Sequence, residues 1–151
     1  MGLINLASNA SAWRGYEYYK ENKVCSIKKI NEDEYEGSVS GSLAEPYSVH
    51  INIAHPKKST CTCPFAEENR KVCKHKVALF FSAFPEEAEK YLAEVEQAEK
   101  EAEEYEEELY DRVSDRISKM KKAELQEALW QVLMDAPEWV FDRFVRDYLE
   151  S

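Results

Sequence analysis

The sequence predicts an α+β fold: a small three-stranded antiparallel sheet with a Cys/His cluster and a short helix, followed by an all-helical region with one long helix. Three observations support this prediction. A half-buried strand pattern ends at Ile53, four Cys and His residues follow it between positions 61 and 75, and neither Gly nor Pro occurs from residue 86 to 136. Period-2 alternation indicates a strand, and a long run without helix breakers permits a long helix.

The N-terminal part is expected to begin with a helix over residues 10–20 and to continue in strands. Two strands, 24–30 and 35–40, are joined by the polar turn at residues 31–33. The third strand is the clearest, because apolar residues at 47, 49, 51 and 53 alternate with polar ones. Cys25 is expected as a core or half-buried thiol, while His50 and His55 are interpreted as ordinary polar residues.

The sheet needs a cover for its apolar face, because three short strands are not stable alone. The segment with the cysteines and the apolar run from 77 to 81 is the expected cover.

The C-terminal part reads as helices throughout. From about residue 86, apolar side chains recur at steps of four and three, which predicts one helix of thirty or more residues. These residues are Tyr91, Val95, Ala98, Ala102, Tyr105 and Leu109. A second helix is expected over 123–134. Asp135 is the expected N-cap of a last helix, with Pro137 in its first turn.

An intramolecular helical hairpin is the simplest way to bury this stripe. In such a hairpin Trp130, Trp139 and Phe144 meet Tyr105 and Leu109. The Glu-rich stretch 94–108 is interpreted mainly as a solvated helix face.

Charge divides the chain near Ala83. Residues 13–82 hold eleven Lys/Arg and nine Asp/Glu, whereas residues 83–151 hold nine and twenty-one, within a total charge of −10. We therefore predict two domains, 1–84 and 85–151. An acidic balance argues against unaided binding to nucleic acid.

No apolar run reaches the roughly 20 residues that a membrane span requires, and the first residues do not resemble a secretory signal. We expect a cytoplasmic protein without membrane contact. In that reducing compartment, cysteines are expected as metal ligands or free thiols, not disulfides.

The pattern Cys-x-Cys, nine residues, Cys-x-His is the strongest chemical signal in the chain. It comprises Cys61, Cys63, Cys73 and His75. Three thiolates and one imidazole satisfy tetrahedral zinc. Four protein ligands leave no position for a catalytic water, so the predicted zinc finger is structural and the protein is not expected to be an enzyme.

Three alternatives compete with zinc. A redox dithiol is usually Cys-x-x-Cys in a βαβ setting, which is absent here. Plain buried thiols would leave the cations at 58, 70, 71 and 74 unexplained, whereas these cations can lower thiolate pKa values. An iron–sulfur cluster is disfavoured by the histidine.

The ligand pattern resembles the SWIM zinc finger family. The resemblance extends over about residues 13–82 and includes Arg14-Gly15, Tyr18-Tyr19, Val39-Ser40-Gly41-Ser42, Tyr47-Ser48-Val49, Cys63-Pro64 and Cys73-Lys74-His75. It implies a small zinc module that binds DNA or proteins. Residues 121–151 loosely resemble the helical segment that often follows this finger. The helicase, transposase or kinase domains to which family members are fused have no counterpart here.

The sequence therefore leads to two alternative predictions of function. The first is an adaptor, in which the zinc-held module and the helices bind an unidentified protein partner. The second is a nucleic-acid contact through cations around the ligands, which could touch phosphates. These cations are Lys57, Lys58, Arg70, Lys71, Lys74 and Lys76. No small-molecule substrate is expected.

Overall fold

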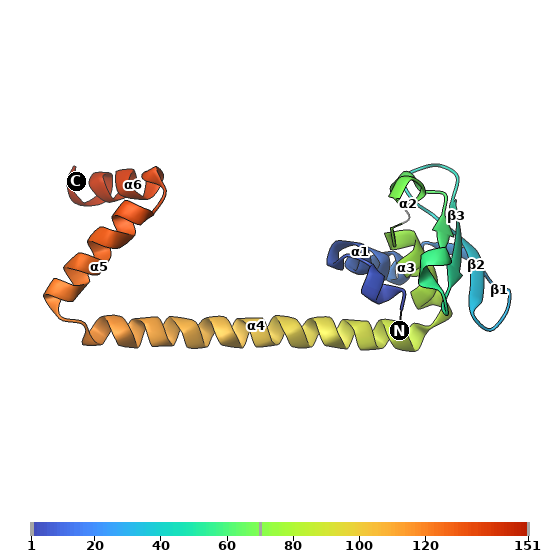
Figure 1. Cartoon of the computed structure of the whole chain (residues 1–151), viewed down its shortest axis with the longest axis horizontal. Coiled ribbons are helices and arrows are strands. Elements are labelled where there is room, and N and C mark those ends of the chain that lie inside the picture. The colour runs from blue at the N-terminus through green and yellow to red at the C-terminus, as the bar shows by residue number, and fades with distance from the viewer. Residues whose placement is uncertain (1, 70, 151) are drawn as a thin grey trace. The chain divides into compact units, whose positions relative to one another are not determined.

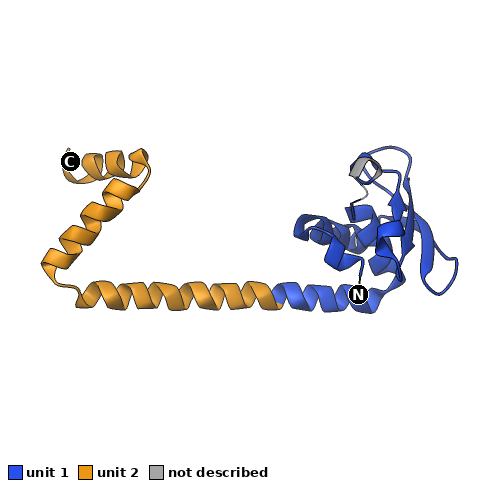
Figure 2. Ribbon diagram, viewed as in Figure 1, with its two compact units in different colours: residues 1–96 blue, residues 97–151 orange. Residues whose placement is uncertain are grey.

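The structure is a computed structural model that describes residues 2–69 and 71–150 (Figure 1). It divides into two compact units, residues 1–96 and 97–151 (Figure 2). The predicted α+β class and the helical C-terminal region with its long helix are confirmed. The boundary after residue 84 stays a prediction. No helix of the described residues is long and apolar enough to cross a membrane.

The first unit contains a sheet and the helices that cover it. In chain order its elements are η1 (Ile4–Leu6), α1 (Asn9–Lys20), β1 (Val24–Lys29), β2 (Glu34–Val39), β3 (Tyr47–Asn52), η2 (Pro56–Lys58), β4 (Thr60–Cys61), α2 (Pro64–Asn69), α3 (Lys74–Ala83) and the first part of α4 (Pro85–Lys119). The predicted helix and three strands thus form within one or two residues of the expected positions.

The sheet has four strands rather than the three predicted. Its order is β1-β2-β3-β4, and every neighbouring pair is antiparallel. The additional strand, β4, has two residues and pairs Cys61 with Val49 and Thr60 with His50. A strand this short has no period-2 pattern, so only its pairing with β3 defines it.

Helix α3 covers the inner face of the sheet, as predicted for the apolar run 77–81. Val77, Leu79 and Phe81 have no exposed surface, and they share one core with Val49 and Ile51 of β3. Helix α1 packs on α3 so closely that Gly15 faces Val77. A Cβ atom on residue 15 would lie 2.4 Å from the Val77 Cβ. The core therefore holds the two helices and β3 in one fixed arrangement.

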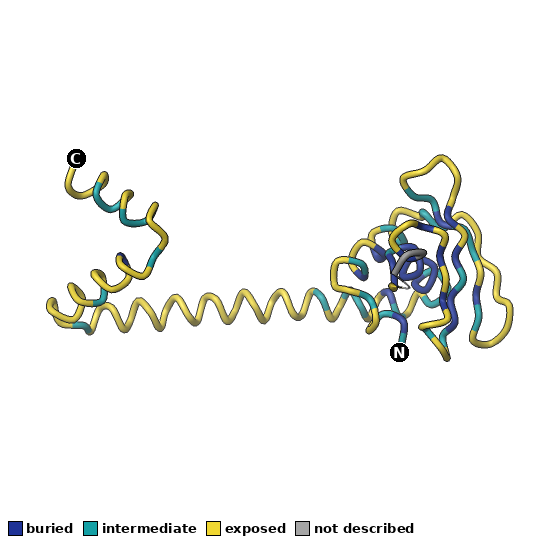
Figure 3. The backbone as a smooth tube through the Cα atoms, turned by 45° about the horizontal axis from the view of Figure 1, so that its top comes forward, coloured by how far each residue is buried: buried dark blue, intermediate teal, exposed yellow. Residues whose placement is uncertain are grey.

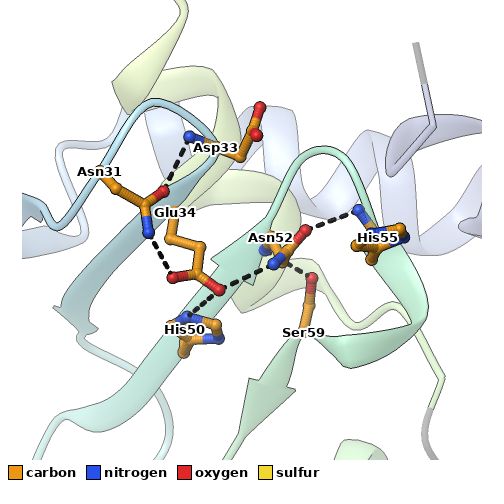
Figure 4. Close-up of polar contacts among 7 residues, drawn as sticks. All are labelled: Asn31, Asp33, Glu34, His50, Asn52, His55 and Ser59. Atoms are coloured by element: carbon orange, nitrogen blue, oxygen red, sulfur yellow. Dashed lines mark hydrogen bonds and ion pairs between the residues drawn. The ribbon is translucent and has the colours of Figure 1, made fainter.

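A polar network joins the first residue of β2 to the last residue of β3, which are neighbours in the sheet (Figure 4). The Glu34 carboxylate accepts hydrogen bonds from Asn31 Nδ2 at 2.7 Å and Asn52 Nδ2 at 2.8 Å, and His50 Nε2 lies 3.8 Å away. The hydrogen bonds from the two asparagines lower the pKa of Glu34. Asn52 Oδ1 also accepts from the His55 backbone N–H at 2.6 Å, so one side chain joins the strand to the following loop.

Cys25 is exposed, so the prediction of a core or half-buried thiol is wrong. It lies where the β1–β2 register shifts between Val24 and Ser26. A bulge at this point interrupts the alternation of side chains on an edge strand, which is why the local pattern misplaced the thiol.

The second unit contains the rest of α4, α5 (Lys122–Asp135) and α6 (Glu138–Tyr148). Asp135 ends α5 instead of capping α6, whose N-cap is Pro137. The predicted N-cap is therefore wrong, and the turn between the two helices is two residues long.

The predicted helical hairpin is also not formed. Tyr105, Trp130 and Trp139 are each more than 60% exposed, and α4 is exposed along its course through this unit (Figure 3). Only Leu133 is buried among the described residues of this unit. The apolar side chains of α4, α5 and α6 are thus largely open to solvent.

Candidate metal centre

The four predicted ligands lie in or directly next to three different elements. Cys61 is the last residue of β4 and is fixed by its pairing with Val49. Cys63 directly precedes α2, Cys73 is the N-cap of α3, and His75 lies in the first turn of α3. Both Cys-x-Cys and Cys-x-His therefore span the end or the beginning of an element, where the backbone turns and neighbouring side chains can converge.

The structure brings all four side chains into one buried cluster. One ligand atom from each lies within 4.8 Å of the others. The exposed fractions are 6% for Cys61, 3% for Cys63, 2% for Cys73 and 4% for His75. Cys61 Sγ lies 3.8 Å from His75 Nδ1. Tetrahedral bonds of about 2.0–2.3 Å place neighbouring ligand atoms about 3.5–3.8 Å apart, so this separation suits two ligands of one zinc ion.

The imidazole of His75 is packed against aromatic rings. Its centroid lies 4.6 Å from that of Tyr47 and 5.6 Å from that of Tyr18. Nε2 is buried and has no hydrogen-bond partner among the described residues. Gly41 leaves room for it, because a Cβ there would stand 3.2 Å from Nε2. A buried imidazole that faces three thiols and is not fully hydrogen-bonded is a poor core residue, but it suits a metal ligand.

The thiols strongly affect one another's ionisation. A hydrogen bond between Cys61 and Cys73 lowers the pKa of Cys73 and, together with burial, raises that of Cys61. Burial also raises the pKa of Cys63. Without a cation the cluster therefore favours one thiolate at Cys73. A divalent metal would displace the remaining protons, because metals bind the thiolate form.

The structure separates the six cations of the predicted nucleic-acid contact into different settings. Lys57, Lys58 and Lys71 are exposed. Lys74 is half-buried, and its Nζ donates to the Tyr18 hydroxyl at 2.7 Å. Lys76 is only 2% exposed and donates to the Lys71 carbonyl oxygen at 3.0 Å. Arg70 lies outside the described residues. Three of the six cations are thus exposed lysines among the described residues, and their role in binding stays a prediction.

A cavity of about 470 Å³ adjoins the cluster. Arg14 and Lys74 line it together with Cys63, Cys73 and His75. Sequence reasoning gave Arg14, Tyr18 and Gly41 no role at the site. Only the tertiary packing of α1 and of the loop before β3 against α3 brings them there, so no local pattern could have shown it.

A buried Cys₃His cluster of this kind has the donor set of a zinc site. The comparison with known protein families agrees: residues 47–84 match the SWIM zinc finger. This segment includes β3, β4, α2 and α3 and all four cluster residues. The resemblance inferred from the sequence is thereby confirmed for this domain, and the buried cluster is typical of zinc in a SWIM finger. Neither the curated proteins nor the solved structures contain a match.

Proposed function

We propose that this chain is a binding module held together by structural zinc, and that it carries out no catalysis. The observation that supports this most directly is the burial of all four donor residues, none more than 6% exposed. Catalytic zinc keeps one position open for water or substrate. Here three thiolates and one imidazole would fill the tetrahedron, so zinc would stabilise the fold and leave recognition to the surface.

A protein is the partner that we propose first. The helices of the second unit expose large apolar side chains, including Trp130 at 61%, Val132 at 61% and Trp139 at 63%. Exposed apolar and aromatic groups of this kind are typical of interaction sites, and tryptophan is enriched among residues that dominate binding energy.

Co-purification from the native cell tests this proposal. We expect wild-type protein to retain a partner after nuclease treatment, and the double variant Trp130→Ser, Trp139→Ser to lose it. The variant Glu127→Ser, also at an exposed position of α5, is the matched control and should retain the partner. Equal retention by all three proteins, or loss of every partner after nuclease, would contradict a protein contact through these residues.

A nucleic acid is the second candidate, because Lys57, Lys58 and Lys71 are exposed close in sequence to the metal ligands. Lys71 Nζ lies 5.6 Å from the centroid of the Phe65 ring, and Phe65 is 48% exposed. A cation beside an exposed aromatic ring is a combination that single-stranded nucleic acids use for phosphate contact and base stacking.

Fluorescence anisotropy with single-stranded and duplex probes at two salt concentrations tests this candidate. The triple variant Lys57→Gln, Lys58→Gln, Lys71→Gln should bind more weakly and show a flatter salt dependence, since each phosphate contact on duplex DNA contributes a slope of about −0.9. Its zinc content should be unchanged. Negligible binding by wild-type protein at low salt would remove this candidate and leave the protein partner.

A further inference from the structure

Helix α4 continues far beyond the residues that pack on the first unit. Every residue from Glu96 to Lys119 is exposed. Isolated helices gain little stability from propensity alone, and most helices in proteins are stabilised by packing an apolar face. Few side-chain pairs support this stretch from within: those at hydrogen-bonding or ion-pair distance are Gln97–Glu101, Lys100–Glu104 and Lys119–Asp115. We therefore expect this exposed stretch to be stabilised by packing its apolar side chains against a partner.

Exposed apolar side chains follow one side of the helix, with the charged Glu106 and Arg116 among them. At about 100° per residue, six of these apolar side chains lie within an arc of about 120°. They are Ala98, Ala102, Tyr105, Leu109, Val113 and Ile117, which we call the α4 stripe. The four large members are 43–62% exposed.

Charge changes sign along the same helix. Residues 97–110 hold seven acidic residues and one lysine, whereas residues 111–119, the last part of the helix, hold three basic and two acidic residues. Two parallel copies would place acidic half against acidic half, which is unfavourable. Two antiparallel copies would place each acidic half against the basic half of the other.

We propose that α4 pairs with α4 of a second copy of this chain, antiparallel and centred near residue 111. In this register Leu109 faces Val113 of the other copy, Tyr105 faces Ile117 and Ala102 faces the region of Met120. The four large members of the two stripes then cover each other. The inference does not rest on the metal centre or on the partner proposed above.

The flanks of the stripe support the same register. On one side of the helix lie Glu101, Glu108, Arg112 and Lys119, by the same 100° spacing. Glu108 of one copy comes opposite the neighbourhood of Arg112 of the other, and Glu101 opposite that of Lys119. Arg112 forms no salt bridge with any described residue of its own chain, so it is available for this contact.

Cross-linking of the native full-length chain tests the orientation. Lys100 and Lys119 are nineteen residues apart, which is about 28 Å along one helix. The antiparallel pair brings them within a few residues of each other. In a mixture of ¹⁴N- and ¹⁵N-labelled protein, a short amine-reactive reagent should therefore yield hybrid Lys100–Lys119 peptides. Lys100–Lys100 and Lys119–Lys119 links in their place would indicate a parallel pair and overturn the proposal.

Light scattering with two adjacent substitutions tests the stripe itself. Wild-type protein should show about twice the chain mass of 17.6 kDa. Val113→Lys places a charge in the stripe and should raise the dimer dissociation constant at least tenfold. Ser114→Lys adds the same charge outside the stripe, about 60° beyond its edge, and should leave the dissociation constant unchanged. Zinc content reports on the first unit in both variants. A wild-type monomer at the cross-linking concentration, or equal behaviour of the two variants, would overturn the proposal.

Discussion

Glu34 is a surface carboxylate whose hydrogen bonds make the stability of the fold depend on pH. It accepts hydrogen bonds from Asn31 and Asn52, and these two bonds hold its pKa below the usual value of 4.5. Its ionised form is therefore favoured in the folded chain. A carboxylate with a lowered folded-state pKa contributes stability above its unfolded-state pKa, and this contribution disappears as pH falls through the folded-state pKa.

The variant Glu34→Gln should therefore melt at a lower temperature than wild type at pH 7, and the difference should shrink as pH falls below about 4.5. Thermal unfolding followed by circular dichroism over this pH range measures both. Glu36→Gln, at an exposed position of the same strand, is the control and should show little difference at either pH. A Glu34→Gln difference that stays constant down to the lowest pH would contradict the proposed role of its charge.

The four cluster residues show what sequence can and cannot predict at the residue scale. Their spacing predicted the cluster, because few other arrangements explain Cys-x-Cys followed by Cys-x-His. The contacts of His75 with Tyr18 and Tyr47 were not predictable, since they depend on how α1 and β3 meet α3. The burial of Lys76 was equally hidden, because in the sequence it looks like one more surface cation.

At the scale of elements, the contact of α1 with α3 supports the part of the backbone that carries two cluster residues, Cys73 and His75. Gly15 allows this contact: a Cβ on residue 15 would lie 2.4 Å from Val77 Cβ and 2.9 Å from the Lys74 carbonyl oxygen. The Lys74 oxygen belongs to the backbone between Cys73 and His75, so moving α1 outward would disturb both ligands.

The variant Gly15→Ala should lower stability. Replacing a helical Gly by Ala gains up to about 1 kcal/mol in helix propensity, whereas overpacking a core costs about 1–3 kcal/mol. Because the clash involves Cβ and backbone atoms, no rotamer change relieves it, and we expect the cost to exceed the gain. Urea denaturation measures the net effect, with Glu17→Ala as the exposed control on α1. A more stable Gly15→Ala protein would show that the two helices are not in close contact.

The elements themselves were predictable where their pattern is local. The alternation of Tyr47, Val49 and Ile51 predicted β3, and the run without Gly or Pro predicted α4. Three errors have one physical origin. The strand β4, the bulge at Cys25 and the missing hairpin are each decided by contacts distant in sequence, for which periodicity carries no signal.

At the scale of the whole molecule, the two units differ in how they are stabilised. The first has a contiguous core that includes Cys61, Cys63 and Cys73. The described residues of the second are mostly exposed. Metal binding should therefore matter for the first unit alone, because removing zinc leaves charged or protonated thiols within its core.

A strong chelator should accordingly abolish amide protection in residues 47–84, while most of the helical circular dichroism signal persists. Hydrogen exchange with mass spectrometry and far-UV circular dichroism, followed during one titration, measure both. Readdition of zinc should restore protection. Simultaneous loss of protection and helicity at one chelator concentration would mean that the chain unfolds as a single cooperative unit.

We propose that Cys61, Cys63, Cys73 and His75 close a structural zinc site, and X-ray absorption at the zinc edge tests this most directly. We predict one zinc per chain with three sulfur ligands at about 2.3 Å and one nitrogen ligand at about 2.0–2.1 Å. The spectrum of the Cys25→Ser protein should be identical, because Cys25 is exposed and outside the cluster. An oxygen ligand in place of one of these four, or protein purified without zinc, would contradict the claim.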